Sequence, residues 1–272
     1  MLIDGLPADQ IPLTDRGLQY GDGLFETIAI QGGRPCLWQR HMSRLQNGER
    51  KLGFPFSDKE RLWHEALKLC SGREEGVLKI ILTRGSGGRG YRPPDPCQPR
   101  RILSTHPWPD YPRSWYEQGI VLRRCDTRFS RQSRLAGIKH LNRLDQVLAR
   151  AEWSDPAVVE GLMLDEMNHV ISGTQSNVFL LKGDQLITPE LSQSGIAGVV
   201  RELVLEFAEQ YSLHPRVIEL ELEELQQADA LFITNSILGL CPVSKFEDRQ
   251  YDLNVIPSEL VKFVNNSYLA DV

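Results

Sequence analysis

The sequence lacks the features that mark several large classes of protein. Its five cysteines are scattered over 272 residues and form no C-x-x-C pair, so neither a disulfide framework nor a structural zinc site is indicated. No stretch approaches the roughly 20 consecutive apolar residues of a transmembrane helix. The first residues, MLIDGLPADQIPLTD, include acids and prolines and cannot form the apolar core of a signal peptide. We therefore expect a cytoplasmic protein with reduced thiols and no membrane partner.

The sequence also lacks an excess of positive charge and several common catalytic motifs. The formal net charge is -5, which gives no electrostatic reason to expect nucleic acid as a partner. The six histidines include no H-x-x-x-H or H-E-x-x-H pair, so we expect no metal site, and no serine lies in the G-x-S-x-G motif of α/β-hydrolases. Residues 85–90 read GSGGRG, but Tyr-Arg-Pro-Pro follows where a dinucleotide-binding motif would begin a helix. This departure excludes a Rossmann site.

The composition that remains is that of an ordinary globular protein, with strand and helix patterns in both halves. A D-G turn predicts a hairpin at 2–7, and Ser57 with Glu60 predicts a capping box at a helix start. The proline-rich run predicts a linker at 108–117 between an N-terminal α/β domain, 1–107, and a C-terminal α/β domain, 118–272. We expect two α/β or α+β domains with any cleft between them. The expected strands are 24–30, 34–38, 76–84, 100–106, 119–124, 161–165, 168–172, 177–181 and 228–236, and the expected helices are 39–52, 58–70, 141–153 and 199–211.

Lys139, in the stretch GIKHLNRL, is a candidate reactive amine. Small or apolar residues precede it, and Leu141 follows. Apolar surroundings lower the pKa of a lysine, and a neutral amine is what a nucleophilic lysine requires. A partly exposed lysine with a buried stem would have the same local sequence, so the stretch alone leaves both interpretations open.

Three other segments have the chemistry to bind an anion. Gly198 precedes a predicted helix whose first amides have no partner within the helix, and 234–236 (Thr-Asn-Ser) follows a predicted strand. Arg44 could add a charge-assisted contact. A glycine-rich loop carries Arg84, Arg89 and Arg92 and is either a lid that binds a carboxylate or only a flexible connection.

Taken in order, these stretches resemble the class IV family of pyridoxal-phosphate enzymes, which has the fold called type IV. The resemblance covers essentially the whole chain, and it is specific as a combination although no single motif is. Within the family, TRGSGGRGY together with AGIKHLNRL is most similar to the aminodeoxychorismate lyases. The stretches that carry the resemblance are DRGLQYGDGLFET (15–27), HMSRL (41–45), GIKHLNRLDQVLAR (137–150), SGTQSNVFL (172–180) and GVVR (198–201).

The resemblance implies a two-domain fold of the D-amino-acid aminotransferase type, with pyridoxal 5'-phosphate in the interdomain cleft. Lys139 would bind the cofactor covalently, and Thr27 is a candidate proton donor beside it. The implied substrate-binding residues are Tyr91, Arg84 and Arg92. The family also implies a homodimer in which the partner chain helps to close the site. The implied cofactor-binding residues are Arg44, Ser172, Asn177, Gly198, Val199, Val200, Thr234, Asn235 and Ser236.

Two positions depart from the family pattern. The threonine of the G-I-T-R turn is Val200 here, which removes a hydroxyl but keeps the amide. Where the family commonly has a glutamate facing the pyridine nitrogen, five residues before Asn177, this chain has Ser172. A glutamate stabilises a protonated ring nitrogen, whereas a serine leaves that nitrogen neutral and the cofactor a weaker electron sink. Ser172 thus indicates either tuning towards elimination or a site where water replaces the carboxylate.

The activity that the resemblance implies is conversion of 4-amino-4-deoxychorismate to 4-aminobenzoate and pyruvate, a carbon–oxygen lyase reaction of folate biosynthesis. The alternatives are a D-amino-acid or branched-chain transaminase of the same fold and a non-enzymatic protein that binds a small molecule.

Overall fold

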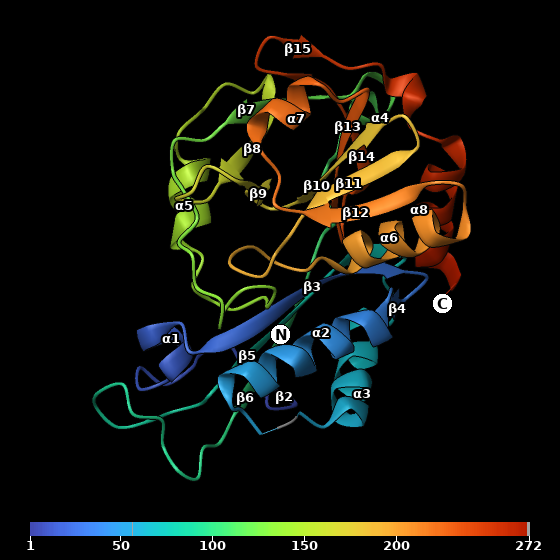
Figure 1. The fold of residues 1–272 in the computed structure, drawn as a ribbon. Coiled ribbons are helices and arrows are strands. Elements are labelled where there is room, and N and C mark those ends of the chain that lie inside the picture. Colours follow the sequence, from blue (N-terminus) through green and yellow to red (C-terminus); the bar gives the residue numbers. More distant parts are fainter. Residues whose placement is uncertain (56, 271–272) are drawn as a thin grey trace. The chain divides into compact units, whose positions relative to one another are not determined.

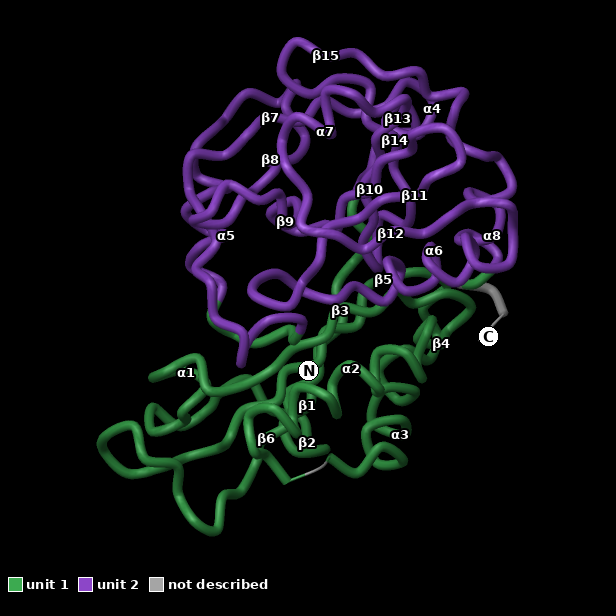
Figure 2. The backbone as a smooth tube through the Cα atoms, viewed as in Figure 1, with its two compact units in different colours: residues 1–109, 138–142, 267–272 green, residues 110–137, 143–266 purple. Residues whose placement is uncertain are grey.

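The computed structural model describes residues 1–55 and 57–270, which form two compact units. Unit 1 comprises Met1–Pro109, Ile138–Asn142 and the chain from Ser267 on, and unit 2 comprises Asp110–Gly137 and Arg143–Asn266 (Figure 2). The predicted boundary near the proline-rich run is therefore close to the structural one. The segment around Lys139, which we expected in the C-terminal domain, is grouped with unit 1.

Unit 1 is built on a six-stranded antiparallel sheet in the order β2-β1-β6-β5-β3-β4 (Figure 1). The predicted hairpin at 2–7 and the predicted strands at 24–30, 76–84 and 100–106 are confirmed, whereas the strand predicted at 34–38 is only Arg34–Pro35, because α2 begins at Trp38. The two central strands pair along their full length, from Gly23 with Thr83 to Gln31 with Glu75. The strands are β1 (Leu2–Ile3), β2 (Leu6–Pro7), β3 (Gly23–Gln31), β4 (Arg34–Pro35), β5 (Glu75–Thr83) and β6 (Arg100–His106).

Three helices accompany this sheet: α1 (Arg16–Tyr20), α2 (Trp38–Leu52) and α3 (Lys59–Cys70). Helix α2 ends at Gly53, which adopts the left-handed conformation, as the sequence predicted. The predicted capping box is wrong. Asp58 caps α3 instead, and Ser57 donates its amide and hydroxyl to Glu49 of α2. Ser57, the cap that local sequence predicts, is thus hydrogen-bonded to a buried carboxylate of the preceding helix and does not cap α3.

Unit 2 contains a nine-stranded mixed sheet in the order β12-β11-β10-β13-β14-β7-β8-β9, with β15 paired to β14 (Figure 1). Its predicted strands are confirmed to within a few residues, while β11, β12, β14 and β15 were not predicted. The strands are β7 (Ile120–Arg124), β8 (Val158–Leu164), β9 (Val170–Gly173), β10 (Asn177–Lys182), β11 (Gln185–Pro189), β12 (His214–Ile218), β13 (Ala230–Asn235), β14 (Gly239–Phe246) and β15 (Arg249–Gln250).

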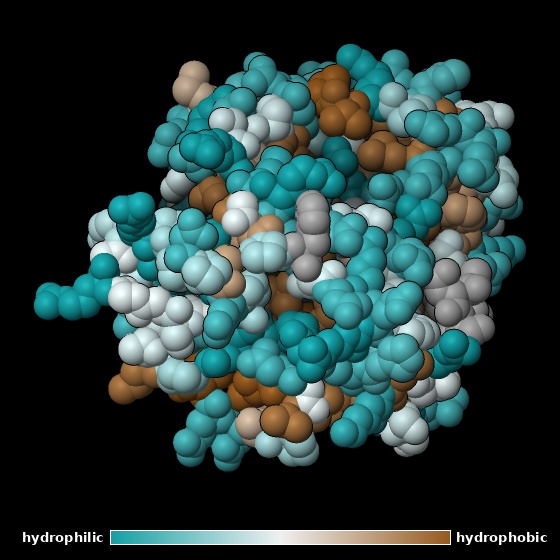
Figure 3. Space-filling view, turned by 90° about the horizontal axis from the view of Figure 1, so that it is seen from below, coloured by the Kyte–Doolittle hydropathy of each residue, from teal (hydrophilic) through white to brown (hydrophobic). Residues whose placement is uncertain are grey.

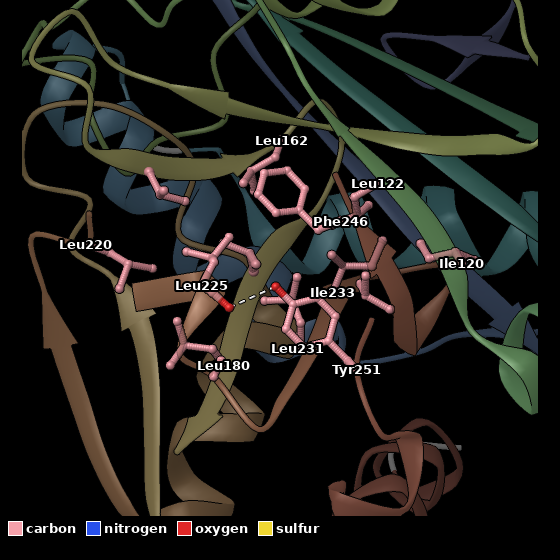
Figure 4. Close-up of a cluster of buried hydrophobic side chains, with 14 of the residues drawn as sticks. Ile120, Leu122, Leu162, Leu180, Leu220, Leu225, Leu231, Ile233, Phe246 and Tyr251 are labelled. Carbon is pink, nitrogen blue, oxygen red and sulfur yellow. Dashed lines mark hydrogen bonds between the residues drawn. The ribbon is translucent and has the colours of Figure 1, made fainter. Parts of the chain in front are cut away.

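The core of unit 2 is a cluster of buried aliphatic and aromatic side chains from this sheet and the helices beside it (Figure 4). Tyr251 lies in the cluster, and its hydroxyl donates to the carbonyl of Leu225 at 2.9 Å. Burying the ring is favourable because the polar end keeps a hydrogen-bond partner. The helices are α4 (Arg113–Gln118), α5 (Leu144–Arg150), α6 (Val199–Gln210), α7 (Leu222–Gln226) and α8 (Ser258–Ala270), with a 3₁₀ turn η1 at Leu253–Val255.

Two expectations about unit 2 need correction. The predicted linker 108–117 overlaps α4, so its later part is helical. The helix predicted over 141–153 is only seven residues long. Its start is not helical because the amide of Leu141 donates to the carbonyl of Gly23 in β3, and its end is a turn after Arg150. Of the side chains on α5, Leu144, Val147 and Leu148 are 73%, 58% and 60% exposed, and the buried one is Ala149.

On the face in Figure 3 the surface is mainly hydrophilic, with hydrophobic patches separated from one another. Of the helices in the described part of the chain, none is long and apolar enough to span a bilayer.

Candidate active site

The backbone around Lys139 is bound to the edge of β3. The amide of Phe25 donates to the carbonyl of Lys139 at 2.9 Å, and the amide of Leu141 donates to the carbonyl of Gly23 at 3.0 Å. The segment is approached through Gly137, whose φ of 78° favours a residue without a side chain. Two residues of Lys139's own segment are therefore fixed by β-type pairing, which sets the direction in which its side chain leaves the backbone.

The side chain of Lys139 lies on the same face of β3 as Phe25. Its Nζ is 4.4 Å from the centre of the Phe25 ring, where the negative face of the ring attracts an ammonium. Thr27 is two residues further along β3 and so shares this face. The predicted apolar flanks of the lysine are confirmed, because Ala136 and Ile138 are 3% and 0% exposed.

The opposite face of β3 carries a buried cluster of charged groups. Glu26 is completely buried, and it accepts from Arg44 Nε at 2.9 Å and also from Arg44 Nη2. His41 Nδ1 lies 2.6 Å from the same carboxylate. Burial by itself raises the pKa of Glu26, but the charge of Arg44 and the hydrogen bonds from both partners lower that pKa to about 2. Burial lowers the pKa of His41 against the opposing effect of Glu26.

The arginine-rich segment, which we expected to be a lid or a flexible connection, is a loop whose backbone carbonyls accept hydrogen bonds from Arg16. Arg16 is buried, and it donates to the carbonyls of Gly90 and Tyr91 and to Asp22. Tyr91 is 85% exposed at the outside of this loop, where it meets Tyr20 edge-on, and Arg92 is also exposed. The loop is therefore anchored at its backbone and presents side chains outward.

Arg84 does not join Tyr91 and Arg92 at that surface. It is 6% exposed, and its guanidinium donates to Asp22 and to the carbonyls of Leu52 and Gly53. These contacts tie β5 to the end of α2, and the expected role of Arg84 in substrate binding stays a prediction.

In unit 2 the start of α6 has the form of an anion site. Gly198 is the N-cap residue, and no side chain makes a capping hydrogen bond there. The amides of Val199 and Val200 are in the first turn, where backbone N–H groups have no acceptor within the helix. A Cβ on Gly198 would lie 2.1 Å from the side-chain oxygen of Asn177, so only glycine fits against that residue. Asn177 in turn donates to the carbonyl of Ile196 at 2.9 Å, which holds the turn before the helix.

Thr234 lies directly across from Asn177 in the pairing of β13 with β10. Side chains opposite each other in an antiparallel pair lie on one face of the sheet, so the hydroxyl of Thr234 and the amide of Asn177 are neighbours. Thr234 is 0% exposed, and its hydroxyl has no hydrogen-bond partner in the described residues. Asn235 accepts from the amides of Ile237 and Leu238, which shapes the loop that contains Ser236. A buried unpaired hydroxyl facing a helix start fits an oxyanion such as a phosphate.

Ser172, at the centre of β9, is 5% exposed and donates its hydroxyl to the carbonyl of Gly173 at 2.8 Å. Close by, Glu160 is 2% exposed and accepts from Thr174, Gln175 and Ser176. No cation of the described residues pairs with Glu160 in an ion pair, so neutral donors alone satisfy this carboxylate. Glu160 thereby orders the loop between β9 and β10.

The sequence interpretation missed Glu26, His41, Glu160 and Arg16 as parts of these arrangements. One signal was available for the first two. Glu26 occupies an inward position of a strand that is otherwise apolar, and residues 41 and 44 are one helical turn apart. The donors around Glu160 come from a distant loop, so no local spacing identifies them.

Comparison with known proteins gives the family. A model of the class IV amino-transferases matches residues 23–246. The chain belongs to the class IV aminotransferase family. Among relatives in this family, aminodeoxychorismate lyase of Vibrio harveyi is 38% identical over 242 residues, which are 89% of each chain. A putative branched-chain-amino-acid aminotransferase of Methanocaldococcus jannaschii is 29% identical over 88% of this chain and 84% of its own.

Solved structures with a similar fold are found as well. The crystal structure of 4-amino-4-deoxychorismate lyase from Pseudomonas aeruginosa superimposes with a TM-score of 0.92 and 44% sequence identity, over 100% of this chain and 98% of the other. The expected type IV fold is thus confirmed.

The charged cluster at Glu26 predicts a loss of stability in acid. The pKa of Glu26 in the folded protein is about 2, below its ordinary value of 4.5, so ionised Glu26 stabilises the fold above pH 4.5. That stabilisation disappears as the pH falls towards 2. Glu26→Gln should flatten this part of the pH dependence of the unfolding free energy, measured by urea denaturation of cofactor-free protein. Glu75→Gln, at an exposed glutamate of the same unit, should retain the wild-type dependence. Equal slopes for wild type and Glu26→Gln would contradict the assignment.

Proposed function

We propose that the protein is a pyridoxal-phosphate-dependent lyase that converts 4-amino-4-deoxychorismate to 4-aminobenzoate and pyruvate. The observation that carries this proposal is the 44% identity to a solved 4-amino-4-deoxychorismate lyase over the whole chain. The transaminase relative from Methanocaldococcus jannaschii is more distant, at 29%. The reaction belongs to folate biosynthesis, and we place it in the cytoplasm.

The residues of each unit fit the cofactor. In unit 1, Lys139 supplies the amine that binds it covalently, and Arg44 supplies charge for its phosphate. In unit 2, the amides of Val199 and Val200 and the 234–236 loop supply phosphate donors, and the unpaired buried hydroxyl of Thr234 is the observation that favours this role. Val200 supplies no side-chain hydroxyl, and we propose that the hydroxyl of Thr234, opposite Asn177 on β13, serves as a phosphate donor.

Pyridoxal phosphate, when bound, accepts electron density from the substrate carbon that loses a proton. The amine of Lys139 would also act as the general base that removes the proton from C4 of the substrate. Enolpyruvate leaves from the neighbouring carbon as the substrate ring becomes aromatic. Lys139 or Thr27, which share one face of β3, protonates the departing group to give pyruvate. Tyr91 and Arg92 are proposed to contact the substrate.

Lys139→Ala tests the central assignment. Wild-type protein should release pyruvate and 4-aminobenzoate without any added keto acid, whereas a transaminase would require one. Lys139→Ala should abolish both products, together with the visible absorbance of the bound cofactor, because the general base and the covalent attachment are lost. Lys182→Ala, at an exposed lysine of unit 2, is the matched control and should behave as wild type. Residual visible absorbance and turnover in Lys139→Ala would rule the assignment out.

We further propose that Ser172 faces the pyridine nitrogen and favours elimination over transamination. A serine is uncharged, so it cannot stabilise a protonated nitrogen as a carboxylate does. Its hydroxyl donates to the Gly173 carbonyl in this structure. A neutral ring nitrogen is an acceptor, so the hydroxyl would turn to donate its hydrogen to that nitrogen. A weaker electron sink suits a reaction in which formation of an aromatic product supplies the driving force.

Ser172→Glu should therefore raise the transaminase side activity with an amino acid and a keto acid, and Ser172→Gln should not. The two side chains are similar in size and differ in charge, so the pair separates the effect of charge from the effect of crowding at this buried position. The measurement is the rate of keto-acid-dependent amino transfer relative to pyruvate release from 4-amino-4-deoxychorismate. An unchanged ratio in Ser172→Glu would refute the proposed role.

A homodimer is proposed on the exposed apolar face of α5. Leu144, Val147 and Leu148 are spaced to lie together on this helix, and all are more than half exposed. A cluster of large apolar side chains on a helix is typical of a surface that a partner covers. We take a second copy of the chain to be that partner.

The combined change Val147→Glu and Leu148→Glu should convert a dimer to a monomer. Light scattering after gel filtration should give about twice the 30.9 kDa chain mass for wild type and the single mass for this variant. Val217→Glu, at an exposed valine of β12, should remain dimeric. A wild-type protein of single mass, or a variant of double mass, would show that α5 is not the interface.

A further inference from the structure

Glu26 is a buried carboxylate at a position where an apolar residue would suffice. Leu24, Ile28 and Ile30 occupy the other inward positions of β3 and are 1% exposed or less, and Glu26 is 0% exposed among them. A buried carboxylate costs several kcal/mol of solvation unless partners compensate it. Since an apolar side chain would pack without this cost, the retained charge indicates a task beyond packing.

Its two partners are on one face of α2. His41 and Arg44 are three residues apart on this helix, so both side chains reach the same strand. Arg44 donates Nε to one carboxylate oxygen and Nη2 to the other, which is the side-on bidentate geometry of a guanidinium and a carboxylate. This geometry fixes both the plane of the guanidinium and its rotation, and it directs the opposite edge of the group away from Glu26.

His41 holds the carboxylate in turn. Its Nδ1 lies 2.6 Å from Oε2 of Glu26, and both side chains are 1% exposed. Burial lowers the pKa of His41, so the neutral ring donates an Nδ1–H to the carboxylate. Glu26 is thus held by donors from two residues and cannot turn to follow a movement of Arg44.

We propose that Glu26 is a positioning residue for recognition of the cofactor phosphate, acting through Arg44. This inference rests on the proposed role of Arg44 as a phosphate ligand. A guanidinium already fixed in orientation loses less conformational entropy when the phosphate binds than one on an unrestrained side chain. The charge of Glu26 has the opposite effect, because it partly neutralises the attraction of Arg44 for a phosphate dianion. The two effects predict opposite changes in affinity when the charge is removed.

The test compares two ligands that differ only in the phosphate. Full-length protein freed of cofactor is titrated with pyridoxal phosphate and with pyridoxal, and the two dissociation constants are measured from the visible absorbance. Glu26→Gln should weaken binding of pyridoxal phosphate about tenfold, as expected when a charge-assisted pair is lost, and leave pyridoxal binding unchanged. Equal weakening for both ligands would make Glu26 a residue of general packing. Unchanged or tighter binding of pyridoxal phosphate would also overturn the proposal.

Controls separate this proposal from the role of Arg44 itself. Glu49→Gln changes another buried glutamate of the same unit, on α2, and should leave both constants at the wild-type values. Arg44→Ala should reduce the preference for pyridoxal phosphate over pyridoxal, and adding Glu26→Gln to it should reduce that preference no further. If Arg44→Ala leaves the preference intact, Arg44 is not a phosphate ligand and the proposed phosphate site fails. If Arg44→Ala reduces this preference and Glu26→Gln does not, the positioning role of Glu26 fails and the phosphate site remains.

Glu26→Asp covers the case in which the glutamine variant does not fold. The shorter side chain keeps the charge but withdraws the carboxylate from Arg44, so the loss should again be confined to pyridoxal phosphate. An aspartate variant with the wild-type preference would exclude a role of geometry and overturn the proposal.

Discussion

The pairing of a short segment with the edge of β3 is the contact on which the candidate site depends. Two hydrogen bonds, from Phe25 to Lys139 and from Leu141 to Gly23, place the lysine on a strand more than a hundred residues away in the chain. Because side chains alternate along β3, the strand presents different groups on its two faces. Phe25 and Thr27 accompany the amine on one face, and Glu26 meets the helix with Arg44 on the other.

Two buried glutamates, one in each unit, are compensated in different ways. In unit 1, Glu26 is paired with a guanidinium and a histidine, so its geometry is rigid and its pKa is low. In unit 2, Glu160 accepts from neutral donors of a single loop. At the start of α6 the first amides have no partner within the helix, and opposite Asn177 lies the Thr234 hydroxyl, which has no hydrogen-bond partner among the described residues. Fully compensated groups define the scaffold, whereas the uncompensated donors are the ones to which an anion is expected to bind.

Local patterns predicted most of the strands and the longer helices, because alternation and helical spacing record which faces are buried. They failed where a distant partner decided the outcome. Ser57 donates to Glu49 and does not cap α3. The start of the helix predicted at 141–153 is not helical, because the Leu141 amide donates to β3. The same limit applies to the site. Motif resemblance singled out Lys139, Arg44 and Thr234. Two features of the site depend on tertiary contacts that no spacing in the sequence encodes. Arg84 donates to Asp22 and to two carbonyls, and Glu26 pairs with Arg44.

Unit 1 is discontinuous in the chain, and this has a consequence for its folding. The residues up to Pro109 contain every strand of the six-stranded sheet, yet the edge of β3 acquires its last partner only from Ile138–Asn142. A fragment ending at the proline-rich run would expose that edge as unpaired N–H and C=O groups, which readily pair with other chains. During synthesis the first sheet therefore stays incomplete until about thirty further residues have emerged. Completion of its hydrogen bonding and arrival of the reactive amine are the same event.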